Sequence, residues 1–352
     1  MTESSHSSDD NTPIDIPIID LSNPNNDEIA SQLWDAARNV GFFTLIHHSI
    51  PQHQIDALFA LSRQFFELDF NTKHSYPFDR EKNSGYEYMM QKPPSTNVVD
   101  EKETFQVTAR AGCMDDLWPT LSHQEEEGKE QQQGFQELML QMIDNSHKLA
   151  CRILSLLESR ACPHVERGTL PNAHQIWGTD GQCTLRLLHY PPVVSAESEQ
   201  DESDTRTNNH QSSALNTTDE SDTDTRWRCG AHTDWGSLTL LFQRMGEDGL
   251  ECRRREDEGI EGDKARWVEV PPMEGGITVN IGDMLKRWSD CKLYSNLHRV
   301  RMPKTVEECA KSRYSIAFFL QADKSALIEN TTDEPITAGD YFAERINAHF
   351  AE

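Results

Sequence analysis

The sequence predicts an all-β core with flanking helices, arranged as a jelly-roll-like barrel. Short apolar or alternating stretches recur between residues 183 and 319 and are separated by glycine- and proline-containing turns, as in many-stranded β proteins. Helical apolar spacing is instead found mainly in the first half of the chain and at its end. Helices that are segregated in this way are expected to pack outside one sheet-built interior.

The first half of the chain combines predicted strands with longer helices. Pro17 places the first strand near a sheet edge or a strand start, and Asn26 or Asp27 can cap the first helix. Residues 71–120 are predicted to be rich in turns. The predicted strands are 16–21 and 42–46, and the predicted helices are 27–40, 51–66 and 135–160.

The second half of the chain contains most of the predicted strands. The mixed-charge residues 253–258 are expected to form a hairpin turn, and a short helix is expected through Leu285 and Trp288. A final helix is predicted from Ala338 to Phe350. The predicted strands are 183–190, 237–242, 249–252, 267–270, 277–281, 298–300 and 314–319.

Two polar segments divide the chain. Residues 1–14 are predicted to be a disordered tail, residues 15–120 an N-terminal region and residues 121–352 the catalytic barrel. An acidic insertion at 195–226 interrupts the barrel with nine Asp and Glu residues against two Arg. It is interpreted as a disordered, solvated surface loop, with partner docking or a lid as the alternatives.

Composition limits the possible partners. The net charge of −26 disfavours nucleic acid and an anionic membrane surface, because both would repel the chain. No apolar stretch approaches the roughly 20 residues of a membrane helix. The eight cysteines contain no C-x-x-C pair and are expected to be mostly reduced thiols of a cytoplasmic protein. The oligomeric state does not follow from the sequence.

The strongest chemical signal is His232-Thr-Asp234, at the start of an apolar stretch. Side chains two residues apart on a strand leave on the same face, so the imidazole and the carboxylate are expected to project together. His298, at the head of a later predicted strand, can supply a third ligand from a neighbouring wall of the barrel. Two histidines and one carboxylate form a site that leaves three positions open on Fe(II). Taken alone, His298 also fits a structural or exposed role.

A second group of residues suits a carboxylate. Arg313 and Ser315 are two apart on one predicted strand, where the guanidinium can donate two parallel hydrogen bonds beside the hydroxyl. An internal salt bridge is the alternative for Arg313. Tyr190, directly before Pro191-Pro192, can add a phenolic donor, or it can simply pack in the barrel.

Together these motifs resemble the isopenicillin-N-synthase-like branch of the Fe(II)- and 2-oxoglutarate-dependent dioxygenases. The resemblance extends over roughly residues 14 to 350. The motifs that carry it are Ile16-Pro-Ile-Ile-Asp20, Gly41-Phe-Phe, Leu185-Arg-Leu-Leu-His-Tyr190-Pro, His232-Thr-Asp234, Asn280-Ile-Gly-Asp283, His298-Arg-Val and Arg313-Tyr-Ser315.

The resemblance implies a double-stranded β-helix and assigns roles to individual residues. Iron is expected at His232, Asp234 and His298, and the distal carboxylate of 2-oxoglutarate at Arg313 and Ser315, with Tyr190 assisting. Within the branch, residues 185–190 and 314–319 are similar to microbial members such as the thymine hydroxylases. That similarity makes Arg186 and Phe319 candidates for contacting the substrate.

The implied activity is oxidation, in the first place hydroxylation, of a small organic molecule. Fe(II) and 2-oxoglutarate are the expected cofactor and co-substrate, dioxygen is consumed, succinate and carbon dioxide are released, and ascorbate is an expected supporting component. Two alternatives remain at this point. One is an iron oxidase of the isopenicillin-N-synthase type that does not use 2-oxoglutarate, and the other is a non-catalytic binding protein built on the same barrel.

Overall fold

The computed structural model describes residues 16–92, 98–123, 133–193, 226–260 and 265–350, except for the side chains of 122, 123, 133 and 347–350. The strands are β1 (Ile18–Asp20), β2 (Phe42–Ile46), β3 (Gly85–Tyr88), β4 (Glu103–Thr108), β5 (Ser122–His123), β6 (Gln133–Gly134), β7 (Thr184–Tyr190), β8 (Cys229–His232), β9 (Leu238–Phe242), β10 (Leu250–Arg253), β11 (Trp267–Glu269), β12 (Gly276–Ile281), β13 (His298–Val300), β14 (Arg313–Leu320), β15 (Leu327–Ile328) and β16 (Ile336–Thr337). The helices are α1 (Asn26–Asn39), α2 (Gln52–Phe66), α3 (Phe70–His74), α4 (Phe135–Ala161), α5 (Thr169–Asn172), α6 (Asp283–Trp288), α7 (Val306–Cys309), α8 (Ala338–Phe350) and the 3-10 helix η3 (Arg255–Asp257).

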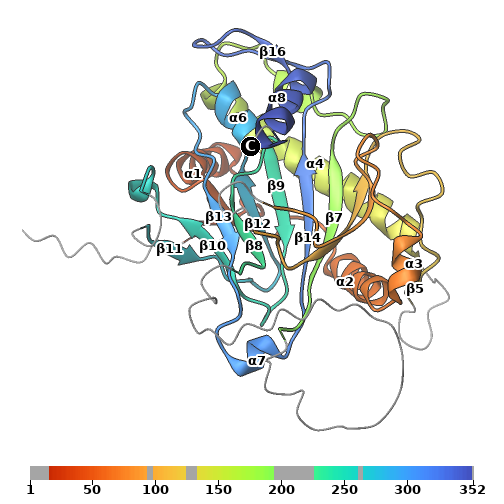
Figure 1. Ribbon diagram of the computed structural model, residues 1–352. Helices are drawn as coiled ribbons and strands as arrows, with labels where there is room; N and C mark the ends of the chain where they lie inside the picture. The colour runs from red at the N-terminus through yellow and green to blue at the C-terminus, as the bar shows by residue number, and fades with distance from the viewer. Residues whose placement is uncertain (1–15, 93–97, 124–132, 194–225, 261–264, 351–352) are drawn as a thin grey trace, which may run out of the picture.

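Two sheets form the barrel (Figure 1). The large sheet has eight strands in the order β1-β2-β12-β9-β14-β7-β4-β3, and the small sheet has four in the order β11-β10-β13-β8. All neighbouring pairs in these two sheets are antiparallel except β1 with β2. Apolar side chains from both sheets, among them Leu188 and Cys252, pack in one cluster between them. The barrel predicted from the sequence is therefore present.

Side-chain alternation gives the large sheet two different faces. On β14, Tyr314, Ile316 and Phe318 belong to the main hydrophobic core, whereas Ala317 belongs to the cluster inside the barrel. The same alternation holds on β7, where Leu185 belongs to the core. Because successive side chains point to opposite faces, one strand can serve the core and the site together.

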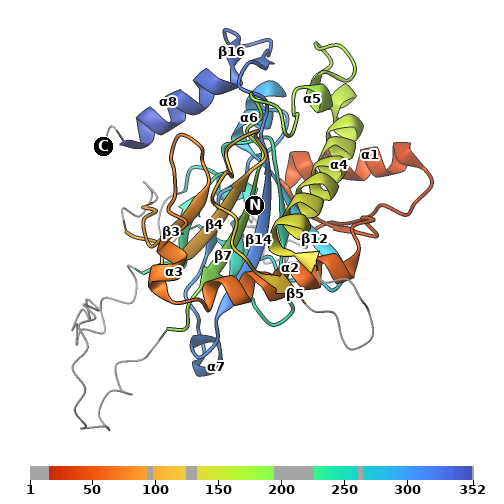
Figure 2. The ribbon, with the colours of Figure 1, turned by 90° about the vertical axis from the view of Figure 1, so that its right-hand side faces the viewer.

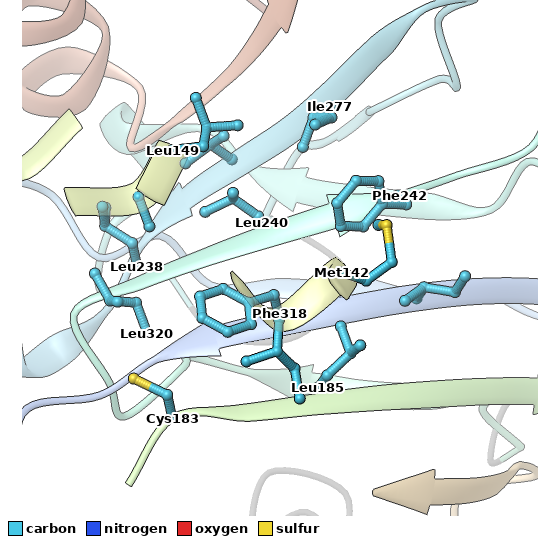
Figure 3. Packing of buried hydrophobic residues seen from close by; sticks show 14 of the residues in the cluster. Met142, Leu149, Cys183, Leu185, Leu238, Leu240, Phe242, Ile277, Phe318 and Leu320 are labelled. Carbon is cyan, nitrogen blue, oxygen red and sulfur yellow. The ribbon is translucent and has the colours of Figure 1, made fainter. Parts of the chain in front are cut away.

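The core lies between the large sheet and three helices. Helices α1, α2 and α4 cover one face of this sheet (Figure 2). Met142 and Leu149 of α4 lie over Leu240 and Phe318 in Figure 3, and all four side chains are buried. Burying such side chains contributes about 1.5–3 kcal/mol each, so the helices stabilise the sheet from outside. This arrangement confirms the predicted placement of the helices.

The predicted strands of the second half are present with boundaries shifted by no more than a residue or so. The description of residues 71–120 as turn-rich was incomplete, because β3 and β4 lie there and extend the large sheet. β4 was missed because its core-facing side begins with the carboxylate of Glu103, so that only Phe105 and Val107 are apolar on that side, and its other face is buried but polar. The predicted tail (1–14) and all of the predicted insertion (195–226) but Arg226 lie outside the described residues.

A buried polar cluster explains why β4 tolerates a carboxylate on its helix side. Glu103 accepts hydrogen bonds from Lys73 Nζ at 2.7 Å, from His189 Nδ1 at 2.6 Å and from the hydroxyl of Tyr86. Burial alone would raise the pKa of Glu103, but these hydrogen bonds hold that pKa below its ordinary value. The ionised carboxylate therefore joins α3, β3 and β7 behind the barrel.

In the part of the chain that the structure describes, no helix has the length and apolar character needed to cross a membrane.

The fully buried His174 makes a pH-dependent contribution to stability. Its Nδ1–H donates to the carbonyl of Leu170 at 2.6 Å, and its Nε2 accepts from the Ser237 hydroxyl at 2.7 Å. Burial lowers the pKa of His174 to about 4. Between pH 6.5 and 4 the unfolded chain therefore binds a proton that the native state excludes, and the free energy of unfolding falls as the pH falls.

We expect this histidine to account for a loss of about 2 kcal/mol in the free energy of unfolding between pH 7 and pH 5. Urea titrations of the parent and of His174→Gln at both pH values measure this loss. The variant should show a smaller decrease than the parent. An equal decrease in both proteins would assign the acid sensitivity to other groups.

Candidate metal centre and active site

The three residues predicted to bind iron come together at one end of the small sheet. His232 is the last residue of β8, His298 is the first of β13, and the two are paired directly across the antiparallel ladder. Oδ1 of Asp234 lies 3.7 Å from His232 Nε2 and 3.8 Å from His298 Nε2. The three ligand atoms lie within 4.8 Å of one another, so one metal ion can contact all three.

Hydrogen bonds orient these donor atoms toward one point. The Nδ1–H of His232 donates to the Gly230 carbonyl at 2.8 Å, and that of His298 donates to the Asn296 carbonyl at 3.0 Å. Each imidazole therefore holds its proton on Nδ1 and presents a lone pair at Nε2. Two such nitrogens and one carboxylate oxygen are the donor set of non-haem Fe(II) sites with open positions.

Two residues of the large sheet hold the other oxygen of the carboxylate. Asp234 Oδ2 accepts from Thr239 Oγ1 at 2.5 Å and from Asn280 Nδ2 at 2.7 Å, which leaves Oδ1 facing the imidazoles. The sequence analysis quoted Asn280 within a motif but gave it no role, and it missed Thr239. The available signal was their inward position on the predicted strands 277–281 and 237–242.

The structural reason predicted for the His-x-Asp spacing was wrong. His232 and Asp234 do not share a strand, because β8 ends at His232 and β9, in the other sheet, begins at Leu238. Asp234 therefore lies in the turn that crosses between the two sheets. Its position follows from the contacts of this turn and not from side-chain alternation.

The turn is held by the segment that follows β12. A Cβ atom at Gly282 would overlap the carbonyl oxygen of Gly236, so only glycine allows this close approach. The next residue, Asp283, donates its backbone N–H to the Asp234 carbonyl at 2.7 Å and accepts from Thr233 Oγ1 at 2.9 Å. Arg345 of α8 lies 3.2 Å from the same carboxylate oxygen of Asp283. The C-terminal helix is thus linked to the turn.

Electrostatics favour the charge states that bind metal. Burial alone would raise the pKa of Asp234, but the imidazoles of His298 and His232 and the two hydrogen bonds to its carboxylate hold that pKa below its usual value. Burial, followed by the neighbouring His232, lowers the pKa of His298 to about 4. At neutral pH the site therefore presents an anionic oxygen and a neutral imidazole.

Arg313, Ser315 and Tyr190 also meet inside the barrel, as the sequence predicted. Arg313 and Tyr190 are paired across β14 and β7, and the guanidinium carbon lies 5.0 Å from the centre of the Tyr190 ring. Arg313 Nη1 donates to Ser315 Oγ at 3.3 Å, and Nη2 donates to Gln243 Oε1 at 3.2 Å. Among the described residues Arg313 forms no salt bridge, which was the alternative considered for it, and its hydrogen-bond acceptors are the neutral oxygens of Glu247 (backbone), Ser315 and Gln243.

The two candidates for contacting the substrate also lie together on the inner face of the barrel. The Arg186 guanidinium carbon lies 5.2 Å from the centre of the Phe319 ring, and Arg186 Nε donates to Gln106 Oε1 at 2.6 Å. Gln106 in turn donates to the backbone and side-chain oxygens of Asn83. Gln106 and Asn83 were missed because they lie in the segment predicted only to be rich in turns.

A cavity of about 530 Å³ lies elsewhere in the molecule. Its lining includes Asn172, Trp288 and Asp323, and it includes none of the predicted site residues. It is therefore separate from the metal centre.

Family models match most of the described chain. Residues 16–129 match the N-terminal domain of non-haem dioxygenases described from morphine synthesis, and residues 182–322 match the 2OG-Fe(II) oxygenase superfamily. A 2-oxoglutarate-dependent dioxygenase from Acremonium sp is 30% identical over 312 residues, which cover 84% of this chain and 83% of that protein. The chain belongs to the 2-oxoglutarate- and Fe(II)-dependent oxygenases.

Solved structures show the same fold. The Neurospora crassa thymine-7-hydroxylase in complex with alpha-KG and thymine is 24% identical, with a TM-score of 0.68 over 95% of this chain and 97% of that one. The rice dioxygenase for auxin oxidation is 20% identical, with a TM-score of 0.64 over 95% and 96% of the two chains.

The protein is an oxidoreductase, a 2-oxoglutarate-dependent dioxygenase with a jelly-roll core that uses Fe(II) and acts on a small molecule. The assignment supports the 2-oxoglutarate-dependent enzyme over the two alternatives from the sequence, the 2-oxoglutarate-independent oxidase and the non-catalytic binding protein.

The two hydrogen bonds to Asp234 Oδ2 lead to a testable prediction. Replacing Thr239 with Val or Asn280 with Ala frees Oδ2 to rotate toward the metal and removes a donor that holds the carboxylate charged. We expect either variant to weaken Fe(II) binding about 10- to 100-fold, as for other groups that orient metal ligands. Anaerobic Fe(II) titration followed by calorimetry measures the affinity.

Thr44→Val is the matched control. It makes the same change at a buried threonine of β2, the strand that pairs with β12, where Asn280 lies. Its Fe(II) affinity should stay at the parent value. Equal affinities in all these variants would mean that the hydrogen bonds to Oδ2 do not orient Asp234.

Proposed function

We propose that His232, Asp234 and His298 hold the iron of this dioxygenase. The observation that carries the proposal is the convergence of two imidazole Nε2 atoms and one carboxylate Oδ1, each with its other polar atom already hydrogen-bonded. A structural role would not require this convergence, because both imidazoles use their Nδ1–H for backbone carbonyls and turn Nε2 toward Oδ1, which has no hydrogen-bond donor among the described residues. A divalent metal supplies the missing positive partner.

We further propose that Arg313 and Ser315 bind the distal carboxylate of 2-oxoglutarate and that Tyr190 closes the same pocket. Arg313 is buried and its hydrogen-bond acceptors are neutral oxygens. A bound carboxylate would therefore neutralise the positive charge of its guanidinium. When bound, the iron and 2-oxoglutarate supply the oxidising chemistry, in which dioxygen is consumed and succinate and carbon dioxide are released. The chain orients both groups and keeps the site enclosed by the two sheets.

The substrate is proposed to be a small, planar compound that carries ring carbonyl groups, such as a pyrimidine base. The Phe319 ring supplies a flat surface for stacking. Arg186 uses its Nε for Gln106, and among the described residues its two terminal nitrogens have no hydrogen-bond acceptor, so they can donate to a carbonyl of the substrate. The complex of the Neurospora crassa hydroxylase with thymine supports this substrate class, because that enzyme has the same fold.

The iron assignment predicts the effect of removing a ligand. His298→Ala and Asp234→Ala should lose Fe(II) binding and conversion of 2-oxoglutarate to succinate, because the remaining two donors cannot hold the ion. Calorimetric Fe(II) titration and labelled succinate formation measure the two losses. His53→Ala, at an exposed histidine of α2, is the control and should keep both properties. Substantial succinate formation by either ligand variant, with folding intact by circular dichroism, would contradict the assignment.

The substrate assignment predicts a separable defect. A screen of pyrimidines, amino-acid derivatives, flavonoids and hormone-like acids should find compounds that stimulate 2-oxoglutarate consumption, with planar carbonyl compounds among the active ones. For such a compound, Arg186→Met should raise KM by about tenfold, the effect of losing one charge-assisted hydrogen bond.

The substrate-free conversion of 2-oxoglutarate is the internal control, because Arg186 is not assigned to 2-oxoglutarate. It should continue at the parent rate in Arg186→Met. An unchanged KM would remove Arg186 from the substrate site, and stimulation only by flexible aliphatic compounds would overturn the proposed substrate class.

A further inference from the structure

A second arginine, Arg228, lies at the same end of the barrel as Arg313. Arg228 directly precedes β8 and is only 5% exposed, although it is charged. Its Nη2 donates to the carbonyl of Lys311 at 3.3 Å. This contact places the guanidinium beside the backbone two residues before Arg313.

Arg228 is poorly compensated for a buried cation. Its Nε has no hydrogen-bond partner among the described residues. Burial and then the positive charge of Arg313 lower the pKa of Arg228, as expected for two neighbouring guanidiniums. Glu308, an acidic residue near Arg228, is already paired with Arg301 at 2.8 Å.

The other buried cations of the described chain show what normally satisfies such a charge. Their partners are carboxylates in each case: Lys73 with Glu103 at 2.7 Å, Lys102 with Asp100 at 2.8 Å and Arg301 with Glu308 at 2.8 Å.

Arg228 and Arg313 differ from these three. In the part of the chain that is described, neither has a carboxylate at ion-pair distance, and their acceptors are carbonyl, amide and hydroxyl oxygens. The carboxylate of Glu247 lies near Arg313, but it accepts from the backbone N–H of Tyr314 and lies 3.6 Å from Arg244. Two buried guanidiniums without a counter-ion are costly, which indicates that an anion belongs beside them.

We propose that Arg228 is a second binding residue for the distal carboxylate of 2-oxoglutarate and acts together with Arg313. The inference rests on the proposed role of Arg313 and adds a residue to that site. A carboxylate has two oxygens and about four lone-pair positions, so two guanidiniums and the Ser315 hydroxyl can donate to it at the same time. The chain then recognises 2-oxo acids by their distal charge more strongly than one arginine would allow.

The test compares two co-substrates that differ only at the distal end. 2-Oxoglutarate carries the distal carboxylate, whereas 2-oxopentanoate has the same carbon chain without it. Binding of each is measured by calorimetry to the anaerobic Fe(II)-loaded enzyme. We expect Arg228→Met to weaken 2-oxoglutarate binding by about tenfold or more, the effect of one charge-assisted hydrogen bond. Binding of 2-oxopentanoate should stay within about threefold of the parent, by the same relation.

Two further variants make the result specific. Arg226→Met is the matched control, because Arg226 is an exposed arginine two residues away that pairs with Glu101 at 2.8 Å, and its binding of both ligands should match the parent. Arg228→Lys keeps the charge and should lose less 2-oxoglutarate affinity than Arg228→Met.

Three outcomes would overturn the inference. The first is unchanged 2-oxoglutarate affinity in Arg228→Met while Arg313→Met loses it, which leaves the role of Arg313 standing. The second is an equal loss for both ligands in Arg228→Met, which indicates general damage to the pocket. The third is parent-like 2-oxoglutarate binding in Arg313→Met, which also removes the proposed function of Arg313.

Discussion

The pairing of β8 with β13 is the interaction on which the proposed metal centre depends. Their antiparallel register sets His232 directly opposite His298 at the end of the small sheet. A shift of one residue would send one imidazole to the other face. Neighbouring contacts maintain this register: β10 pairs with the far side of β13, and Asp100 accepts from the backbone N–H of Gly230 on β8 at 2.8 Å. The two histidines can therefore remain in place before any metal binds.

The large sheet contributes to the same centre by a different physical route. Its outward side chains bury apolar surface against α1, α2 and α4, and its inward side chains carry the polar groups of the site. Arg313 and Ser315 face inward, while Tyr314 and Ile316 between and beside them face the helices. The stability of the core and the placement of the proposed co-substrate pocket therefore depend on the same strands.

Much of the fold followed from local patterns in the sequence. Alternation predicted that Arg313 and Ser315 share a face, and apolar spacing predicted α1, α2 and α4 with small boundary errors. The strand β4 was missed because its buried charge is satisfied by Lys73 and His189. Such a partner set is distant in sequence and leaves no periodic signal.

In the candidate site, too, local patterns predicted some features, whereas contacts between distant residues determine others. The convergence of His232, Asp234 and His298 was predicted from their residue types and order, but the turn that carries Asp234 was mistaken for part of a strand. Its geometry depends on the approach of Gly282 to the backbone of Gly236, a contact between positions far apart in the chain. The burial of Arg228, the further residue proposed for this site, also left no signal, because Arg228 contacts the backbone of Lys311, which is 83 positions away in the chain and precedes β14.

The link from α8 to the His-x-Asp turn bears on how the protein is handled as a reagent. Arg345 contacts Asp283, which accepts a hydrogen bond from Thr233, the residue between His232 and Asp234. Shortening the chain into α8 so that Arg345 is lost would delete this contact. A truncated version of the protein should therefore keep α8 at least through Arg345 if the turn at the proposed iron site is to be preserved.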